Sequence, residues 1–184
     1  MTRIIGGTAR GRRLAVPAAG VRPTSDRARE GLFNTLATML DLRSARFLDL
    51  YAGSGAVGLE ALSRGADVTL VESDRAARAV LERNVAVVGR ATVIGATVDS
   101  YLAGQPTGEF DVVFADPPYA LDDSGLAKVL TRLVAGNWLS VGSTVVVERS
   151  ARSNPPLWPN PLDSVKQKRY GEGMFWYGRA DECV

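Results

Sequence analysis

From residue 47 onward, two hydrophobic patterns alternate along the chain. Short runs that are apolar throughout predict five buried strands, at 47–51, 68–72, 92–94, 110–116 and 144–148. Between them, apolar residues at helical spacing predict three helices and one helical turn, at 56–64, 74–88, 123–134 and 99–102. Strands that are apolar on both faces and alternate with helices indicate a parallel, doubly wound sheet. The predicted fold class is therefore α/β.

The N-terminal part of the chain follows another pattern. Two short apolar pieces around glycine-containing turns predict a small hairpin within residues 1–16. A linker with Pro at both ends follows. Thr24 or Ser25 then caps a helix that is predicted to run to about Leu40.

The C-terminal part predicts a second hairpin. Segments 165–170 and 174–177 flank the turn Gly171-Glu172-Gly173, which favours two antiparallel strands added to the sheet edge. We therefore expect two parts: an N-terminal arm and linker at 1–22, and one main domain at 23–184.

Composition excludes several kinds of chemistry. The 184 residues are 46% hydrophobic and 23% charged, as in ordinary globular proteins, and no apolar run approaches the ~18 residues of a membrane span. We expect no membrane association and a cytoplasmic location. The chain contains no histidine, which excludes a histidine general base, a Ser-His-Asp triad and histidine metal ligands. The single cysteine, Cys183, excludes an internal disulfide and a cysteine-rich zinc site, so no metal is expected.

Charge is distributed unevenly. Residues 1–46 hold nine Arg and three acids, a net charge of +6, whereas the remainder has a net charge of −4. A basic arm on a mildly acidic body indicates a polyanionic partner contacted by one end of the protein. A solvated surface rich in arginine is the alternative interpretation.

The stretch DLYAGSGAVG, at 49–58, joins the first of these strands to a helix. Gly53, Gly55 and Gly58 match G-x-G-x-x-G in that context, which is typical of a tight turn that a nucleotide can approach closely. Glu72 ends the next strand, 19 residues after Gly53, where its carboxylate can accept hydrogen bonds from ribose hydroxyls. The stretch therefore predicts a nucleoside cofactor, with a turn that serves only packing as the alternative.

Asp49 indicates which nucleoside. A fixed negative charge just before the glycines is unfavourable beside a pyrophosphate and favours a cationic ligand such as S-adenosylmethionine, which carries a sulfonium and an ammonium group. The same residue and the absence of histidine disfavour an NAD-dependent oxidoreductase. Alternatively, Asp49 caps backbone N–H groups.

Asp116, Pro117, Pro118 and Tyr119 directly follow a buried strand. The Asp116 carboxylate and the Pro117 carbonyl can accept two hydrogen bonds from one exocyclic amine, so that the lone pair of the nitrogen points at a methyl donor. Pro118 stiffens the loop, and Tyr119 offers a face for a flipped-out base. No strong base is needed, because the amine becomes acidic once methylated. In the alternative, Asp116 caps the next helix and Tyr119 is an edge aromatic.

These motifs resemble one known family. DLYAGSGAVGLEALSRGA, VES and FADPPY, together with the upstream RPTSDRAREGLFNTL and the closing KRYGEGMFWY, are similar to the bacterial RsmD-type methyltransferases. The resemblance implies a class I methyltransferase fold, a mostly parallel sheet of seven strands with the last antiparallel, preceded by the basic hairpin. It also implies methyl transfer from S-adenosylmethionine to N2 of a guanine in 16S ribosomal RNA, within an assembling 30S particle.

The resemblance assigns the site residues. Catalysis falls to Asp116, Pro117, Pro118 and Tyr119. The cofactor residues are Asp49, Ala52, Gly53, Gly55, Glu72, Ser73, Thr97 and Val98. Contacts to RNA phosphates, which give affinity and salt dependence, are assigned to Arg3, Arg10, Arg12, Arg13 and Arg22. The protein is expected to act as a monomer.

One position departs from related enzymes. Many of them place an Asp after the third strand to bind the adenine amino group, and the matching residue here is Thr97, with Asp99 two residues further on. The Thr97 hydroxyl or the Val98 backbone would take that role.

Two other functions stay open. Asp-Pro-Pro-Tyr is shared with methylases of the adenine N6 amine in DNA or RNA. A ribosome-binding module that keeps the fold without activity is the alternative from a different functional class.

Overall fold

The computed structural model describes residues 2–16 and 24–181, which divide into two compact units. Unit 1 is Met1–Ala96 and unit 2 is Thr97–Val184. Arg22, one of the predicted RNA contacts, lies outside the described residues. Across the described part of the chain, every helix is too short or too polar to span a bilayer.

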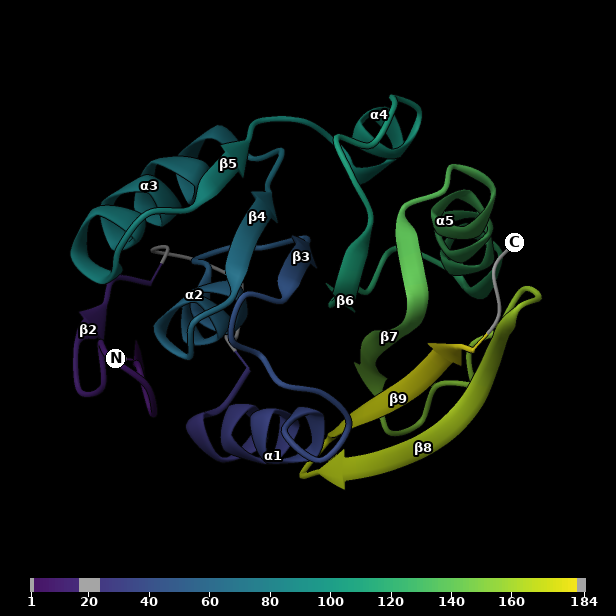
Figure 1. Cartoon of the computed structure of the whole chain (residues 1–184), viewed down its shortest axis with the longest axis horizontal. Coiled ribbons are helices and arrows are strands. Elements are labelled where there is room, and N and C mark those ends of the chain that lie inside the picture. The colour runs from purple at the N-terminus through teal and green to yellow at the C-terminus, as the bar shows by residue number, and fades with distance from the viewer. Residues whose placement is uncertain (1, 17–23, 182–184) are drawn as a thin grey trace. The chain divides into compact units, whose positions relative to one another are not determined.

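Unit 1 combines a hairpin with three parallel strands and three helices (Figure 1). Strands β3, β4 and β5 are parallel, in the order β5-β4-β3, and β1 pairs antiparallel with β2, as the predicted hairpin requires. The elements are β1 (Thr2–Arg3), β2 (Arg13–Leu14), α1 (Asp26–Leu36), β3 (Arg46–Leu50), α2 (Ala56–Ser63), β4 (Asp67–Val71), α3 (Arg75–Val88) and β5 (Thr92–Ile94).

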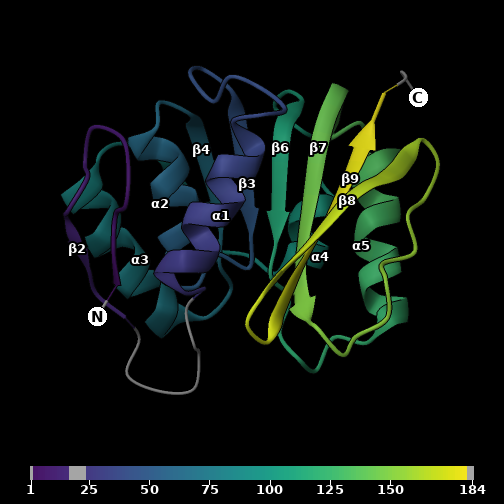
Figure 2. The same cartoon turned by 90° about the horizontal axis from the view of Figure 1, so that it is seen from below.

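Helices α1 and α2 cover the same face of β3. The ring of Phe47 on β3 stacks on Phe33 of α1, with centroids 6.3 Å apart. Asp49, two residues further along β3, accepts a hydrogen bond from the backbone N–H of Gly58 in α2. Residues two apart on a strand point to the same face, so one face of β3 contacts both α1 and α2 (Figure 2).

The N-terminal hairpin is bound to α2 by buried polar side chains. Glu60 is fully buried, and its carboxylate accepts from the backbone N–H groups of Ile5 at 2.7 Å and Gly6 at 2.8 Å. Ser63, one helical turn later, accepts from the N–H of Ala9 at 2.9 Å and donates to the Gly6 carbonyl at 2.6 Å. The hairpin has only two residues in each strand, so these contacts replace the ladder bonds that longer strands would supply.

Arg29 of α1 holds the first strand of the hairpin. Its guanidinium is fully buried and donates to the Thr2 hydroxyl, to the Arg3 carbonyl and to the carboxylate of Asp26. Burial lowers the pKa of Arg29, while the charges of Asp26 and Glu60 oppose that shift. A buried guanidinium with this many acceptors stays charged and links β1 to α1.

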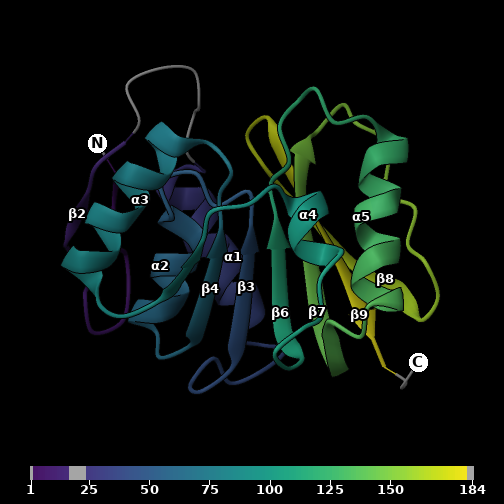
Figure 3. The ribbon, with the colours of Figure 1, turned by 90° about the horizontal axis from the view of Figure 1, so that it is seen from above.

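Unit 2 continues the α/β pattern and ends in a hairpin (Figure 3). The strand order is β6-β7-β9-β8, in which β6 and β7 are parallel and β9 is antiparallel to both of its neighbours. Helices α4 and α5 lie on the same face of β6 and β7 in Figure 3. The elements are α4 (Val98–Leu102), β6 (Phe110–Ala115), α5 (Asp123–Ala135), β7 (Leu139–Ser150), β8 (Leu162–Tyr170) and β9 (Gly173–Ala180).

The predicted fold class is confirmed: a mostly parallel seven-stranded α/β sheet whose last strand is antiparallel. Several boundaries were wrong, and the strands of the C-terminal hairpin run further than predicted, over Leu162–Tyr170 and Gly173–Ala180. The first helix ends at Leu36, because Thr38 turns back and its hydroxyl donates to the Thr35 carbonyl. The strand predicted at 144–148 runs from Leu139 to Ser150, since Gly142, at φ 76°, permits a local irregularity that hides the strand pattern.

The buried guanidinium of Arg29 generates the first prediction. Replacing Arg29 by Leu should lower the free energy of unfolding by roughly 2–4 kcal/mol, because Asp26 and the hairpin acceptors lose their donor. Arg27, an exposed residue on the same helix, provides the control: Arg27→Leu should change stability by no more than about 0.5 kcal/mol. Urea unfolding of the two variants measures the difference, and equal effects would show that Arg29 is not a structural link.

Candidate functional site

The loop between β3 and α2 has an unusual backbone. Tyr51, directly after β3, has φ 63°, and Gly53 and Gly55 follow with φ 55° and 80°. A bulky residue with positive φ is strained, and such strain concentrates at functional sites. Ala52, between them, donates its N–H to the Val71 carbonyl at the end of β4, at 2.9 Å, which fixes the loop to the neighbouring strand.

The three glycines of the G-x-G-x-x-G motif, two in the loop and Gly58 in α2, have different roles. A Cβ at Gly53 would meet nothing within 4 Å, so the backbone is open to an approaching ligand there. At Gly55 a Cβ would lie 2.3 Å from Leu81 of α3, and at Gly58 it would lie 2.3 Å from Leu70 of β4. The second and third glycines therefore allow close packing, and the first leaves space for a ligand.

Glu72 orders this loop from the next strand end. One carboxylate oxygen accepts from the N–H of Gly53 at 2.8 Å, and the other accepts from the N–H of Asp74 at 2.7 Å. Each oxygen keeps a further lone pair that can accept a hydroxyl. Ser73, beside it, is exposed. The structure thus brings Glu72 to the glycine loop, as the spacing predicted.

Asp49 is buried against α2. Its carboxylate accepts from the Gly58 N–H at 2.9 Å, so the capping role considered for it is confirmed. Burial raises the pKa of Asp49 to about 7, the bond from Gly58 opposes that shift, and the negative charge of Glu72 adds to it. A cationic group nearby would favour the ionised form.

In unit 2, Asp116 and Pro117 follow the last residue of β6, whose residues from Val112 are buried. Helix α5 is capped by Asp122, which accepts from the Gly125 N–H at 2.7 Å, so the idea that Asp116 caps that helix is wrong.

The rest of this loop is mostly exposed. Pro117 is buried, Pro118 is exposed, and the Pro118 carbonyl accepts from the N–H of Leu121 at 2.9 Å. The side chain of Tyr119 is 95% exposed, which does not fit an aromatic packed at an edge. A large ring held open to solvent by a stiff loop is suited to stacking on a base.

Thr97 and Val98 begin α4. The Thr97 hydroxyl accepts from the Ser100 N–H at 3.1 Å as the helix cap, and the Val98 side chain is buried. The helix thus begins one residue before the predicted start at Asp99, whose carboxylate pairs with Arg132.

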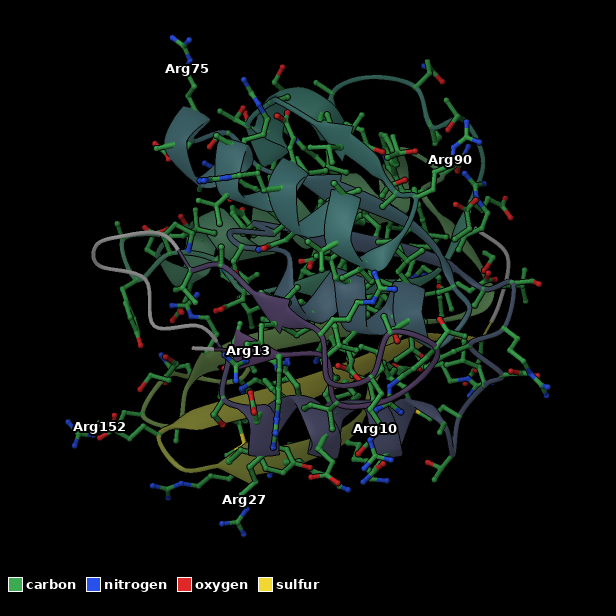
Figure 4. All side chains as sticks on the ribbon, turned by 90° about the vertical axis from the view of Figure 1, so that its left-hand side faces the viewer. Arg10, Arg13, Arg27, Arg75, Arg90 and Arg152 are labelled. Atoms are coloured by element: carbon green, nitrogen blue, oxygen red, sulfur yellow. The ribbon has the colours of Figure 1, made fainter. Side chains whose placement is uncertain are left out.

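Four of the five predicted RNA contacts lie on the hairpin; Arg22 is outside the described residues. Arg3, Arg10, Arg12 and Arg13 are exposed, and Arg10 and Arg13 are labelled in Figure 4. Arg3 lies near Asp26, with a closest N–O distance of 3.7 Å, and Arg12 donates to the carbonyl of Val87. Within residues 2–16 and 24–181, no group of three or more acidic or cysteine side chains is placed to hold a metal ion.

Comparison with known proteins identifies the family. The family described as "Conserved hypothetical protein 95" matches residues 2–179. The ribosomal RNA small subunit methyltransferase D of Escherichia coli is 42% identical over 94% of this chain and 87% of its own length. The chain belongs to the RsmD-type methyltransferase family. The predicted family is confirmed, and with it S-adenosylmethionine as the cofactor of this class.

Solved structures agree with this fold. The putative methyltransferase yhhF from Escherichia coli is 37% identical, covers 98% of both chains and gives a TM-score of 0.86. Magnesium protoporphyrin IX methyltransferase from Synechocystis, solved with bound SAM, is only 10% identical, covers 83% of this chain and 78% of its own, and has a TM-score of 0.64. At that identity the similarity shows the class I fold alone.

Sequence reasoning missed two residues of this RsmD-type protein. Tyr51 gives no signal, because only the fold forces its positive φ. Asn84 could have been found: it lies three and four residues after Leu81 and Val80, on the buried face of the predicted helix, where a polar side chain needs partners.

The raised pKa of Asp49 predicts how stability changes with pH in the ligand-free protein. The carboxyl of Asp49 has a pKa of 3.8 in the unfolded chain and about 7 in the folded protein, so the folded protein binds the proton more tightly. Protonation of Asp49 therefore stabilises the folded protein fully below pH 4. That contribution declines as pH rises to about 7 and is then constant. In Asp49→Asn it is absent, so the wild type should lose stability relative to this variant between pH 4 and 7. Urea unfolding across that range measures it, and a constant difference would contradict the raised pKa.

Proposed function

We propose that this chain transfers a methyl group from S-adenosylmethionine to the exocyclic N2 amine of a guanine in small-subunit ribosomal RNA. The observation that carries the proposal is the loop after β6, where Asp116 and Pro117 leave a buried strand and Tyr119 is held 95% exposed. The names of the curated relatives, which are small-subunit RNA methyltransferases, support the RNA substrate.

The chemistry needs acceptors more than a base. An exocyclic amine is a poor nucleophile, because its lone pair is delocalised into the purine ring. Hydrogen bonds from its two N–H groups to the Asp116 carboxylate and the Pro117 carbonyl favour a pyramidal nitrogen with a localised lone pair. The proton then leaves the methylated, acidic amine without a strong base, which fits a chain without histidine. Tyr119 stacks on the flipped base and Pro118 limits the motion of the loop.

The glycine loop of unit 1 binds the donor. Glu72 accepts from the ribose hydroxyls through its remaining lone pairs, and the open backbone at Gly53, with Ala52 and Ser73, approaches the nucleoside. The buried Asp49 favours the cationic methionine part of the donor. The backbone of Val98 serves the adenine, because the Thr97 hydroxyl already caps its helix.

The hairpin contacts the RNA backbone. Arg3, Arg10, Arg12 and Arg13 give affinity for phosphates with little sequence preference. The target guanine is therefore selected by its exposure in the assembling 30S particle, which a monomer of this chain approaches with the hairpin.

The identity of the product tests the proposal. Small-subunit particles from a strain lacking this protein, incubated with it and S-adenosylmethionine carrying a labelled methyl group, should yield labelled N2-methylguanosine after digestion to nucleosides. N6-methyladenosine would instead assign the protein to the adenine methylases. Absence of label from every nucleoside would favour a binding module without activity.

Asp116 provides a second test. Asp116→Ala should reduce turnover by at least ~100-fold, by analogy with the loss of one preorganised polar partner of a transition state, while the affinity for S-adenosylmethionine is unchanged. Asp122→Asn is the matched control, because it removes the same charge six residues away and keeps the helix cap. Single-turnover methylation and calorimetry measure the two quantities. Unchanged turnover in Asp116→Ala would contradict the mechanism.

A further inference from the structure

Asn84 on α3 is 2% exposed and binds two separate segments of unit 1. Its side-chain oxygen accepts from the Ala15 N–H at 2.8 Å, and its side-chain nitrogen donates to the Ala15 carbonyl at 2.9 Å. The same nitrogen donates to the Ser54 carbonyl at 2.8 Å. Ala15 directly follows β2 of the hairpin. Ser54 lies between Gly53 and Gly55 of the glycine loop that joins β3 to α2, here called the cofactor loop.

The three partners determine the orientation of the amide. With the oxygen toward the Ala15 N–H, both hydrogens of the nitrogen face carbonyl oxygens. The reversed amide would place its oxygen against the carbonyls of Ala15 and Ser54 and leave three groups without suitable partners. Asn84 therefore makes the two backbone hydrogen bonds with Ala15 that a neighbouring strand would make, and its second N–H donates to the Ser54 carbonyl.

Two other residues that attach the hairpin, Glu60 and Ser63, contact segments other than the cofactor loop. Glu60 and Ser63, in the second half of α2, bind the backbone near Gly6 and Ala9. On α3, Leu81 packs where Gly55 lacks a side chain, one helical turn before Asn84. Helix α3 thus supports the loop by packing through Leu81 and by hydrogen bonding through Asn84.

We infer that Asn84 is a positioning residue that fixes the arginine-bearing hairpin and the cofactor loop relative to each other. The hairpin meets RNA and the loop meets the donor, so this inference rests on the proposed function. The Asn84 side chain then fixes the positions of the hairpin and the cofactor loop, which are the two binding surfaces of unit 1. Its loss should weaken donor binding and RNA binding together, although Asn84 touches neither ligand.

The test compares Asn84→Ala with Ser63→Ala. Ser63→Ala removes two bonds to the hairpin and none to the cofactor loop, so it is a matched control. In Asn84→Ala we expect the Kd for S-adenosylmethionine, measured by calorimetry without RNA, to rise roughly 5- to 10-fold. The KM for the small-subunit particle should rise as well. In Ser63→Ala only the KM should rise.

Hydrogen exchange separates positioning from general destabilisation. Asn84→Ala should accelerate exchange within residues 2–16 and 51–55 while β3 and β4 keep their protection, whereas Ser63→Ala should affect only the hairpin. Faster exchange throughout unit 1, or an unchanged donor Kd, would overturn the inference. If Asn84→Ala does not fold, the same measurements are made on Asn84→Ser, because a hydroxyl has one donor hydrogen and cannot serve the Ala15 and Ser54 carbonyls together. Failure of the wild type to bind S-adenosylmethionine would instead count against the proposed function.

Discussion

Side-chain acceptors, all of them buried except the half-buried Glu72, hold the irregular backbone of unit 1, and its binding surfaces depend on them. Asp49 and Glu72 accept from N–H groups of the glycine loop and its flanks, while Glu60, Ser63 and Asn84 accept from the hairpin. Neither segment has enough regular structure to satisfy its own N–H groups. An unsatisfied buried N–H costs about 1–3 kcal/mol, so these acceptors decide whether the loop and the hairpin keep one conformation.

In the loop after β6 of unit 2, acceptors are proposed to bind a substrate and not the backbone of the protein itself. There the acceptors of Asp116 and Pro117 serve a substrate amine in the proposed reaction, and the helix that follows has its own cap in Asp122. Two prolines replace the donors that would otherwise compete for those acceptors.

Much of this could be predicted from the sequence, where short-range chemistry decides the structure. The helix Arg75–Val88 and the strand Thr92–Ile94 follow from local pattern and caps. The strand Leu139–Ser150 was predicted too short, because Gly142 interrupts its pattern and only pairing with β6 and β9 shows that it continues. The sequence did not decide between a helix cap and a ligand contact for Thr97, because a hydroxyl can serve as either.

By itself, the sequence determined the α/β class, the glycine loop with Glu72, the Asp116–Tyr119 loop and the basic N-terminus, because each depends on residues close in the chain or on strand ends in a parallel sheet. Only the tertiary structure decided that Asp49 is buried with a raised pKa, and that Asn84 joins Ala15 to Ser54. The physical reason is that burial and hydrogen bonds between residues 30 to 69 positions apart have no local pattern.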